Sequence, residues 1–355
     1  MRIDTQVDDL SLGAMNVAVG VDGRDVINSA VNAGGFAVTG TIESGSRVWV
    51  TIEGVRQEAV VGGDGDWVAQ FAPGALAGGE REAAMLVEVI DAAGNRATLS
   101  DSVRIDTLVN RLDHDGGVGG DGVVNLAEAG AGITLSGRVE PGSTAQVAVF
   151  GRVYDAVVDG AGNWSLVVPA ADVPLIEGEV EMTVTATDWA GNMAVIADGF
   201  TLDMVAPDTP GIIGYFRQGD GYRNATVETG EDAITIHQVN ATGDVAPLDL
   251  GVQENAFTGE TDYFFLDGAG QLRSVPDGSQ LVVTATDAGG NASSTYVVLD
   301  ETNTQVVDLA TPDLAPFNIE TIDLRFGDQA QLSLTEAQVR ALSESSDTVM
   351  VQGGA

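Results

Sequence analysis

The sequence contains no cysteine, no lysine and only two histidines, His114 and His237. Without cysteine there can be no disulfide scaffold, thiolate metal site or cysteine nucleophile, and a catalytic imidazole would have to come from one of the two histidines. All 15 basic residues are arginines, set against 53 carboxylates, so the formal net charge is -38. Such a charge opposes binding to nucleic-acid phosphates and to anionic lipid. We therefore expect neither a nucleic-acid partner nor enzymatic activity.

Long apolar runs are absent as well, since none approaches the roughly 18 residues that would cross a bilayer. Aromatic residues make up only 5% of the chain, whereas apolar residues make up 44% and the mean hydropathy is +0.12. This apolar content is enough to form hydrophobic cores, so the acidity does not indicate disorder. We expect a folded, very acidic monomer that does not insert into membranes.

What the sequence does have is an internal repeat. The residue pairs that recur at an offset of 97 are Gly40 and Gly137, Trp67 and Trp164, Asp91 and Asp188, Asn95 and Asn192, and Asp106 and Asp203. A third, weaker copy follows at an offset of 99, in which Asp188 corresponds to Asp287 and Trp164 to Tyr263. Residues 2–5 repeat residues 104–107, which close the first full copy, so we expect the chain to start within the last strand of a preceding copy.

Within each copy, apolar residues alternate with polar ones. In residues 181–187, Met182 and Val184 point to one face and the threonines to the other, which is the pattern of a half-buried antiparallel strand. About seven such short strands, separated by Gly- and Asp-rich turns, fill each copy and indicate a β-sandwich. We expect the aromatic residue after a Gly-rich turn in each copy to cap one end of its core; these residues are Trp67, Trp164 and Tyr263.

The predicted fold class is all-β, with tandem β-sandwich domains in a linear array and a small mixed strand-helix-strand C-terminal segment. The predicted boundaries are 1–11 for the last-strand remnant and linker, 12–107, 108–206 and 207–301 for three sandwiches, the third divergent, and 302–355 for the C-terminal module. Within that module we expect a strand at 319–324, a helix at 335–342 with Thr335 or Ser333 as N-cap, and a strand at 348–351.

Carboxylates recur in step with the repeat. The turn of residues 91–95 recurs at 188–192 and 287–291, always between the last two strands of its copy. Because the last strand leaves at the far end of a sandwich, the hairpin that starts it should lie beside the closing Asp of the preceding copy. Three acidic sets should therefore converge at each junction: the closing Asp, an Asp- and Gly-rich leading loop, and the hairpin Asp. The closing residues are Asp4, Asp106 and Asp203, the leading-loop residues are Asp22, Asp25, Asp115, Asp121 and Asp220, and the hairpin residues are Asp91, Asp188 and Asp287.

Oxygen ligands grouped without histidine or cysteine favour Ca²⁺ over transition metals, so we predict calcium sites at these junctions. In the second leading loop, Asp113, Asp115 and Asp121 fall at positions 1, 3 and 9 of an EF-hand loop. Gly117 and Val124 occupy positions 5 and 12, so a complete EF-hand is absent. The alternative is that Asp and Gly only form turns, which both residues favour.

Several segments resemble a known family. Residues 39–46 and 136–143, the Gly-Asn-Trp turn and the Ala-Thr-Asp-x-Ala-Gly-Asn hairpin are similar to the bacterial Ig-like repeats of giant, type I secreted RTX adhesins. The resemblance implies that the sandwiches are Ig-like and that the loop of residues 121–128 and closing residues such as Asp106 bind Ca²⁺ between neighbouring repeats. It also implies that the chain is an extender of an extracellular, biofilm-type adhesin on the bacterial cell surface.

The first copy departs from that pattern. Arg24 and Val31 stand where the second copy has Asp121 and Glu128, so Asp22 and Asp25 would have to substitute for them. The tail from residue 319 resembles short modules that precede RTX repeats, although the RTX nonapeptide itself is absent.

The divergent third copy leaves a second function open, namely a module that binds a surface glycan or protein ligand. In a chain with few aromatics it concentrates six of them, Tyr215, Phe216, Tyr222, Tyr263, Phe264 and Phe265. The same divergence is also typical of a terminal repeat that caps an array.

Overall fold

The computed structural model describes residues 4–219, 221–228, 230, 232–240, 243–255, 258–299, 306–307, 309, 312–327, 329–343 and 346–353. The chain divides into two compact units. The first contains residues 1–118, 133–172 and 179–200, and the second contains residues 119–132, 173–178 and 201–355.

The first sandwich lies within the first unit and consists of two sheets. One sheet has the order β1 (Ser11–Leu12), β4 (Phe36–Thr41), β8 (Asp66–Phe71) and β7 (Val60–Val61). The other has the order β2 (Ala18–Val19), β3 (Asp25–Ile27), β10 (Arg96–Asp106), β9 (Glu80–Ile90), β5 (Arg47–Ile52) and β6 (Val55–Glu58), and helix α1 (Ser29–Gly34) follows β3. Alternating residues such as Val48, Val50 and Ile52 are fully buried between the sheets, as period-two patterning requires.

The strands of the second sandwich form one continuous ladder. Its order is β11 (Leu112–His114), β13 (Ile133–Val139), β16 (Asn163–Val168), β15 (Arg152–Val158), β14 (Thr144–Val149), β17 (Gly178–Thr187), β18 (Met193–Leu202) and β12 (Val123–Val124). The short helices here are η1 (Val118–Gly120), α2 (Leu126–Ala131) and η2 (Ala170–Asp172). In both sandwiches the last strand pairs in parallel with a short strand near the start of its copy, β10 with β3 and β18 with β12.

A tryptophan and a glycine pack together in each of the first two sandwiches. Trp67 and Trp164 are almost completely buried, and the Trp164 indole N–H donates to the Asp113 carbonyl at 3.0 Å. A Cβ at Gly137 would lie 2.2 Å from that carbonyl oxygen and 2.8 Å from the Trp164 ring, so only glycine fits there. The third aromatic at this position, Tyr263, is only partly buried and packs against the core of its sandwich.

The third sandwich belongs to the second unit. One of its sheets has the order β19 (Ile212–Gln218), β20 (Gly221–Glu228), β24 (Glu260–Leu266) and β23 (Asp249–Asn255), with β25 (Val275–Pro276) also paired to β20. The other sheet has the order β22 (Val245–Pro247), β21 (Ala233–Val239), β26 (Ser279–Thr286), β27 (Ala292–Leu299), β29 (Ile319–Asp323) and β31 (Met350–Gln352).

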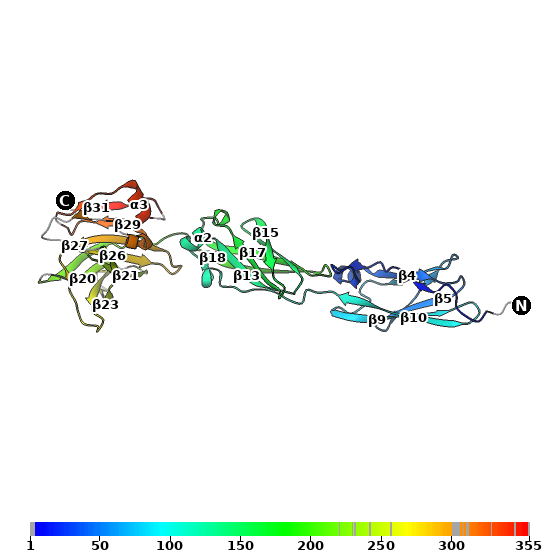
Figure 1. Ribbon diagram of the computed structural model, residues 1–355. Coiled ribbons are helices and arrows are strands. Elements are labelled where there is room, and N and C mark those ends of the chain that lie inside the picture. The colour runs from blue at the N-terminus through cyan, green and yellow to red at the C-terminus, as the bar shows by residue number, and fades with distance from the viewer. Residues whose placement is uncertain are drawn as a thin grey trace. The chain divides into compact units, whose positions relative to one another are not determined.

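The C-terminal module extends that second sheet, as the orange and red elements beside β27 show in Figure 1. Its remaining elements are β28 (Val306–Val307), paired with β30 (Gln331–Leu332), η3 (Pro312–Phe317) and α3 (Glu336–Leu342). The expected strand-helix-strand order is confirmed, and Thr335 is the N-cap of α3 in a capping box with Gln338. Residues Tyr296 and Val298 of β27 share a buried cluster with Ile322 and Leu342 of the module. The module therefore packs on the third sandwich.

Candidate metal centres

The recurring hairpin turn has the same hydrogen bonds in all three copies. In the second copy, Asp188 Oδ1 accepts from the backbone N–H groups of Ala190 and Asn192, both at 2.8 Å. Asp91 Oδ1 and Asp287 Oδ1 accept in the same way from the backbone of Asn95 at 2.7 Å and of Asn291 at 2.9 Å. Each hairpin aspartate thus forms a turn through one carboxylate oxygen, the role that Asp favours.

The hairpin of the second copy meets the end of the first sandwich through an asparagine side chain. Asn192 Nδ2 donates to the backbone carbonyl and to Oδ1 of Asp106, each at 3.0 Å, and to Asp188 Oδ2 at 2.7 Å. Asn192 Oδ1 accepts from the backbone N–H of Ser29 at 2.8 Å. Asn28, the N-cap of α1, donates through Nδ2 to the Ala190 carbonyl at 2.9 Å. We call this set of contacts, which lies entirely within the first unit, the first joint.

Three carboxylates cluster at the first joint. Oxygens of Glu80, Asp106 and Glu140 all lie within 4.8 Å of one another. Glu80 faces Asp106 across the β9–β10 ladder, while Glu140 follows β13 of the second sandwich. Asp106 is completely buried, and its Oδ2 has no hydrogen-bond partner.

Burial, together with the negative charges of Asp188, Glu140 and Glu80, raises the pKa of Asp106 to about 6. Burial also raises the pKa of Glu140. A buried, unpartnered carboxylate oxygen surrounded by other carboxylates is costly unless a cation satisfies it. The all-oxygen donor set fits a hard divalent cation such as Ca²⁺.

A related cluster lies at the start of the first sandwich. Oxygens of Asp4, Glu43 and Asp91 lie within 4.8 Å of one another, and Glu43 Oε1 also accepts from the backbone N–H of Asp8 at 2.9 Å. Glu43 and Asp91 precede Glu140 and Asp188 by one repeat offset, and Asp4 occupies the place of a closing aspartate. The two clusters are thus equivalent positions of the repeat.

The second joint, where the third sandwich follows the second, lies within the second unit. Asn291 Nδ2 donates to the Asp203 carbonyl at 3.0 Å, and Asn291 Oδ1 accepts from the backbone N–H of Leu126 at 2.9 Å. Asn125 Nδ2 donates to the Gly289 carbonyl at 3.1 Å. Burial, then the charges of Asp287 and Glu177, raise the pKa of Asp203. Among the described residues, neither Asp203 nor Asp287 belongs to a three-carboxylate group as close as the two above.

Among the described residues, no leading-loop aspartate belongs to either three-carboxylate cluster. Asp22 Oδ1 accepts from the backbone of Arg24 at 3.1 Å, and Asp25 is exposed at the start of β3. Asp121 Oδ1 accepts from the backbone of Val123 at 2.9 Å. The expected member Asp220 lies outside the described residues.

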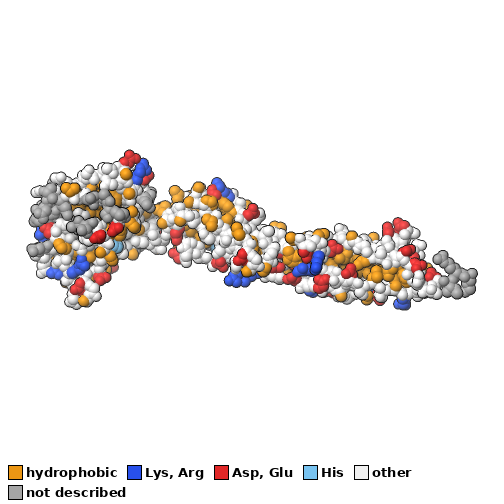
Figure 2. Space-filling model, in the orientation of Figure 1, with side chains coloured by type: hydrophobic (Ala, Val, Ile, Leu, Met, Phe, Trp, Pro, Cys, Tyr) orange, Lys and Arg blue, Asp and Glu red, His pale blue; other side chains and the backbone are white. Residues whose placement is uncertain are grey.

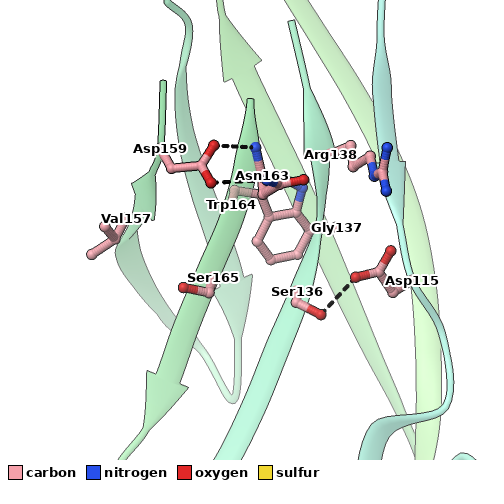
Figure 3. Close-up of a pocket in the computed structure, with 9 residues that line it drawn as sticks. All are labelled: Asp115, Ser136, Gly137, Arg138, Val157, Asp159, Asn163, Trp164 and Ser165. Carbon is pink, nitrogen blue, oxygen red and sulfur yellow. Dashed lines mark hydrogen bonds between the residues drawn. The ribbon is translucent and has the colours of Figure 1, made fainter. Parts of the chain in front are cut away.

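Asp115 is held by the face of the second sandwich. Its Oδ2 accepts from Ser136 Oγ at 2.7 Å, at the edge of a shallow cavity of about 340 Å³ (Figure 3). The same view shows Asp159 bonded to Asn163, with the Trp164 ring between the two pairs. Because Trp164 is almost completely buried, its ring offers no stacking platform to a ligand in this cavity.

The loop that carries Asp115 and Asp121 has backbone contacts with two different strands of the second sandwich. Strand β11 pairs with β13 just before Asp115, and Gly122 O then accepts from the backbone of Thr201, near the end of β18. The hairpin Asp188–Asn192 precedes the other end of β18. The prediction that both aspartates meet Asp106 stays a prediction; neither belongs to the three-carboxylate group that contains Asp106.

Sequence reasoning missed several residues of the two joints, above all glutamates and the helix-capping asparagines. The sequence did contain a pattern that could have identified them, because these residues also recur at the offset of 97. The missed pairs are Asn28 and Asn125, Glu43 and Glu140, and Glu80 and Glu177.

The aromatic residues of the third sandwich mostly build its core. Tyr222 and Phe265 are fully buried, and Tyr215 packs edge-on against Tyr222 and Phe326. Phe216 is the exposed exception, at 57%. The concentration of aromatics therefore does not favour a ligand-binding surface.

In the part of the visible face that is coloured by residue type, acidic side chains are scattered among uncharged and apolar ones, and arginines occur in small groups (Figure 2). In the described part of the chain, no helix is long and apolar enough to cross a membrane.

The sequence matches no protein-family model and no curated protein sequence. Among solved structures, the chain resembles one that concerns host cell surface retention of a bacterial ice-binding adhesin, at 24% identity and a TM-score of 0.42, covering 81% of this chain and 96% of the other. Another is a Ca²⁺-stabilized adhesin that helps an Antarctic bacterium bind ice, at 22% identity and a TM-score of 0.39, covering 88% and 79%.

A third neighbour is a tetra-tandem repeat from the extending region of a large adhesion protein, at 20% identity and a TM-score of 0.25, covering 82% of this chain and 78% of that one. These three neighbours are described as adhesins or a large adhesion protein, and at these TM-scores they do not by themselves define a function. The strand content and sheet topology show an all-β protein of tandem β-sandwiches.

Proposed function

We propose that this chain is a calcium-rigidified extender region of a bacterial cell-surface adhesin, acting outside the cell and without catalytic activity. The observation that carries the proposal is the buried carboxylate of Asp106, whose Oδ2 has no partner and whose surroundings are three further carboxylates, Glu80, Glu140 and Asp188. The resemblance of the repeats to RTX adhesin extenders supports the same role.

The first joint gives calcium a specific task. Asp106 and Glu80 belong to the first sandwich and Glu140 and Asp188 to the second, so a cation bound by all four ties the two sandwiches together. Without the cation these charges repel one another, by roughly 1 to 4 kcal/mol for a pair at 4 Å depending on the dielectric. Calcium therefore converts a repulsive contact into a stabilising one.

The remaining hairpin and closing aspartates are proposed ligands of equivalent sites. Asp4, Asp91 and Glu43 would hold an ion at the start of the first sandwich, and Asp203 and Asp287 would hold one at the second joint. Asp22, Asp25, Asp115, Asp121 and Asp220 are weaker candidates, because those of them that are described belong to neither cluster.

Isothermal titration of calcium into two variants tests the proposal. Asp188→Ala removes a proposed ligand, so we expect the loss of one bound ion relative to the wild type. Asp159→Ala is the matched control, because Asp159 forms the same turn, with 2.8 and 2.9 Å hydrogen bonds from Ala161 and Asn163, but belongs to neither three-carboxylate cluster. If Asp188→Ala binds as many ions as the control, Asp188 is only a turn former.

Calorimetry provides the second measurement. Extracellular calcium sites bind with a Kd of about 10⁻⁴ to 10⁻³ M, and each contributes about 2.7 kcal/mol when free calcium exceeds Kd by 100-fold. Chelation should therefore lower the Tm by several degrees. An identical melting curve in calcium and in excess EDTA would contradict the calcium role.

A further inference from the structure

The two joints share their asparagine bridges but differ in one aromatic residue. The hairpin at the first joint carries Trp189, whereas the corresponding position at the second joint is Ala288. The Trp189 carbonyl accepts from the backbone N–H of Val21 at 3.0 Å, a contact between the second sandwich and the first. The hairpin is thus attached to the first sandwich by a backbone hydrogen bond that does not depend on a bound cation.

The Trp189 ring packs on the first sandwich as well. The guanidinium carbon of Arg104 lies 3.8 Å from the centroid of the ring, a cation–π arrangement. On the backbone of the first sandwich, a Cβ at Gly20 would lie 2.6 Å from a ring carbon, so the ring closes directly against that glycine. The ring therefore bridges the two sandwiches through Arg104 and Gly20.

Arg104 also places a fixed positive charge beside the carboxylate cluster. Its Nη2 lies 3.4 Å from Glu80 Oε1. At the second joint the equivalent position is Thr201, which has no charge. The first joint thus contains an arginine that offsets part of its carboxylate charge, and the second joint has no arginine at that position.

We propose that Trp189 and Arg104 form a calcium-independent latch, which keeps the first joint closed when calcium is removed while the second joint opens. This inference rests on the proposed calcium role for the response of the second joint. The two joints then respond differently to calcium removal: the first loses the stabilisation that the ion gives it but stays closed, and the second opens.

Two equivalent amides report on the joints separately. The backbone N–H of Ser29 donates to Asn192 at the first joint, and that of Leu126 donates to Asn291 at the second. Site-resolved amide hydrogen exchange by NMR measures the opening of each bond. In the wild-type protein, excess EDTA should reduce the protection of Leu126 by roughly tenfold or more relative to that of Ser29.

Trp189→Ala in EDTA should reduce the protection of Ser29 to the level of Leu126. Trp49→Ala is the matched control, because Trp49 also packs against arginines, Arg47 and Arg56, but on β5 away from the joint; it should leave Ser29 unchanged. Arg104→Gln should give an intermediate loss. The exchange of the buried Val147 amide verifies that the second sandwich stays folded.

The outcomes separate the two proposals. If Ser29 remains protected in Trp189→Ala in EDTA, or if Ser29 and Leu126 lose protection equally in the wild type, the latch is wrong. If Leu126 in the wild type does not respond to EDTA, the part of the inference that concerns the second joint fails together with the calcium role at that joint, while the Ser29 result in Trp189→Ala still decides the latch.

Discussion

Replacing Asp106 with Asn should change stability in opposite directions with and without calcium. The substitution preserves the shape of the side chain and keeps an oxygen to accept from Asn192 Nδ2. It removes one charge from the buried cluster and gives the unpartnered Oδ2 position an N–H group that can donate to Glu80 or Glu140. Without calcium the variant loses a repulsive charge, and with calcium it loses a ligand.

The magnitude follows from the pKa of Asp106, which lies at about 6 rather than at the ordinary 3.8. A shift of about two units corresponds to roughly 3 kcal/mol between the protonated and ionised forms. Asp106→Asn should therefore stabilise the calcium-free protein at pH 7.5 by up to about 3 kcal/mol. In calcium at 100 times Kd, the wild type gains about 2.7 kcal/mol from the ion, most of which the variant forfeits.

Differential scanning calorimetry in EDTA and in calcium measures both effects, at roughly 2 to 4 °C per kcal/mol for a structure of this size. Asp159→Asn is the control: hydrogen bonds from Asn163 lower the pKa of Asp159, so that variant should lose stability equally in both buffers. A lower Tm for Asp106→Asn in both buffers would refute the reasoning, because Asp106 would then act only as a hydrogen-bond acceptor.

Two further predictions concern pH and packing. Because the fold raises the pKa of Asp106 from 3.8 to about 6, the folded state holds this proton more tightly than the unfolded chain. Calcium-free wild type should therefore melt at a higher temperature at pH 5 than at pH 7.5. A Tm that is higher at pH 7.5 than at pH 5 would contradict the raised pKa. Adding calcium or introducing Asp106→Asn should reduce this difference in Tm between the two pH values. Gly137→Ala should destabilise the second sandwich by about 1 to 3 kcal/mol, because its Cβ would overlap the Asp113 carbonyl and the Trp164 ring. Gly160→Ala, whose Cβ meets nothing within 4 Å, should stay within about 0.5 kcal/mol in chemical denaturation, and equal losses in the two variants would show that the overlap does not matter.

The local features of the fold could be predicted from the sequence because they depend on neighbouring residues. Alternation such as that of Met182 and Val184 determines which face of β17 is buried, and the Asp-x-x-Gly-Asn turn forms its own hydrogen bonds within five residues. The repeat offset then transferred each local assignment to the next copy. Thr335 was also recognisable as a helix cap, because capping is a local interaction.

The composition of the carboxylate cluster was decided by the tertiary structure. Glu80 reaches Asp106 only because the β9–β10 ladder places them opposite each other, and Glu140 arrives from the following sandwich. The loop that carries Asp115 and Asp121 has suitable ligand spacing, yet neither residue belongs to either carboxylate cluster. Ligand spacing along a chain therefore does not determine which carboxylates come together.

The attachment of the C-terminal module likewise depended on long-range pairing. The sequence by itself determined that residues after 318 form a strand, a helix and a strand, because each has its own periodicity and cap. Only the tertiary structure decided that β29 lies parallel to β27 and buries Tyr296 and Val298. The physical reason lies in the edge of β27. In the described part of the chain, no short strand from the start of the third copy pairs with β27 as β3 pairs with β10 and β12 with β18. Unpaired backbone groups at a sheet edge are then satisfied by a later strand.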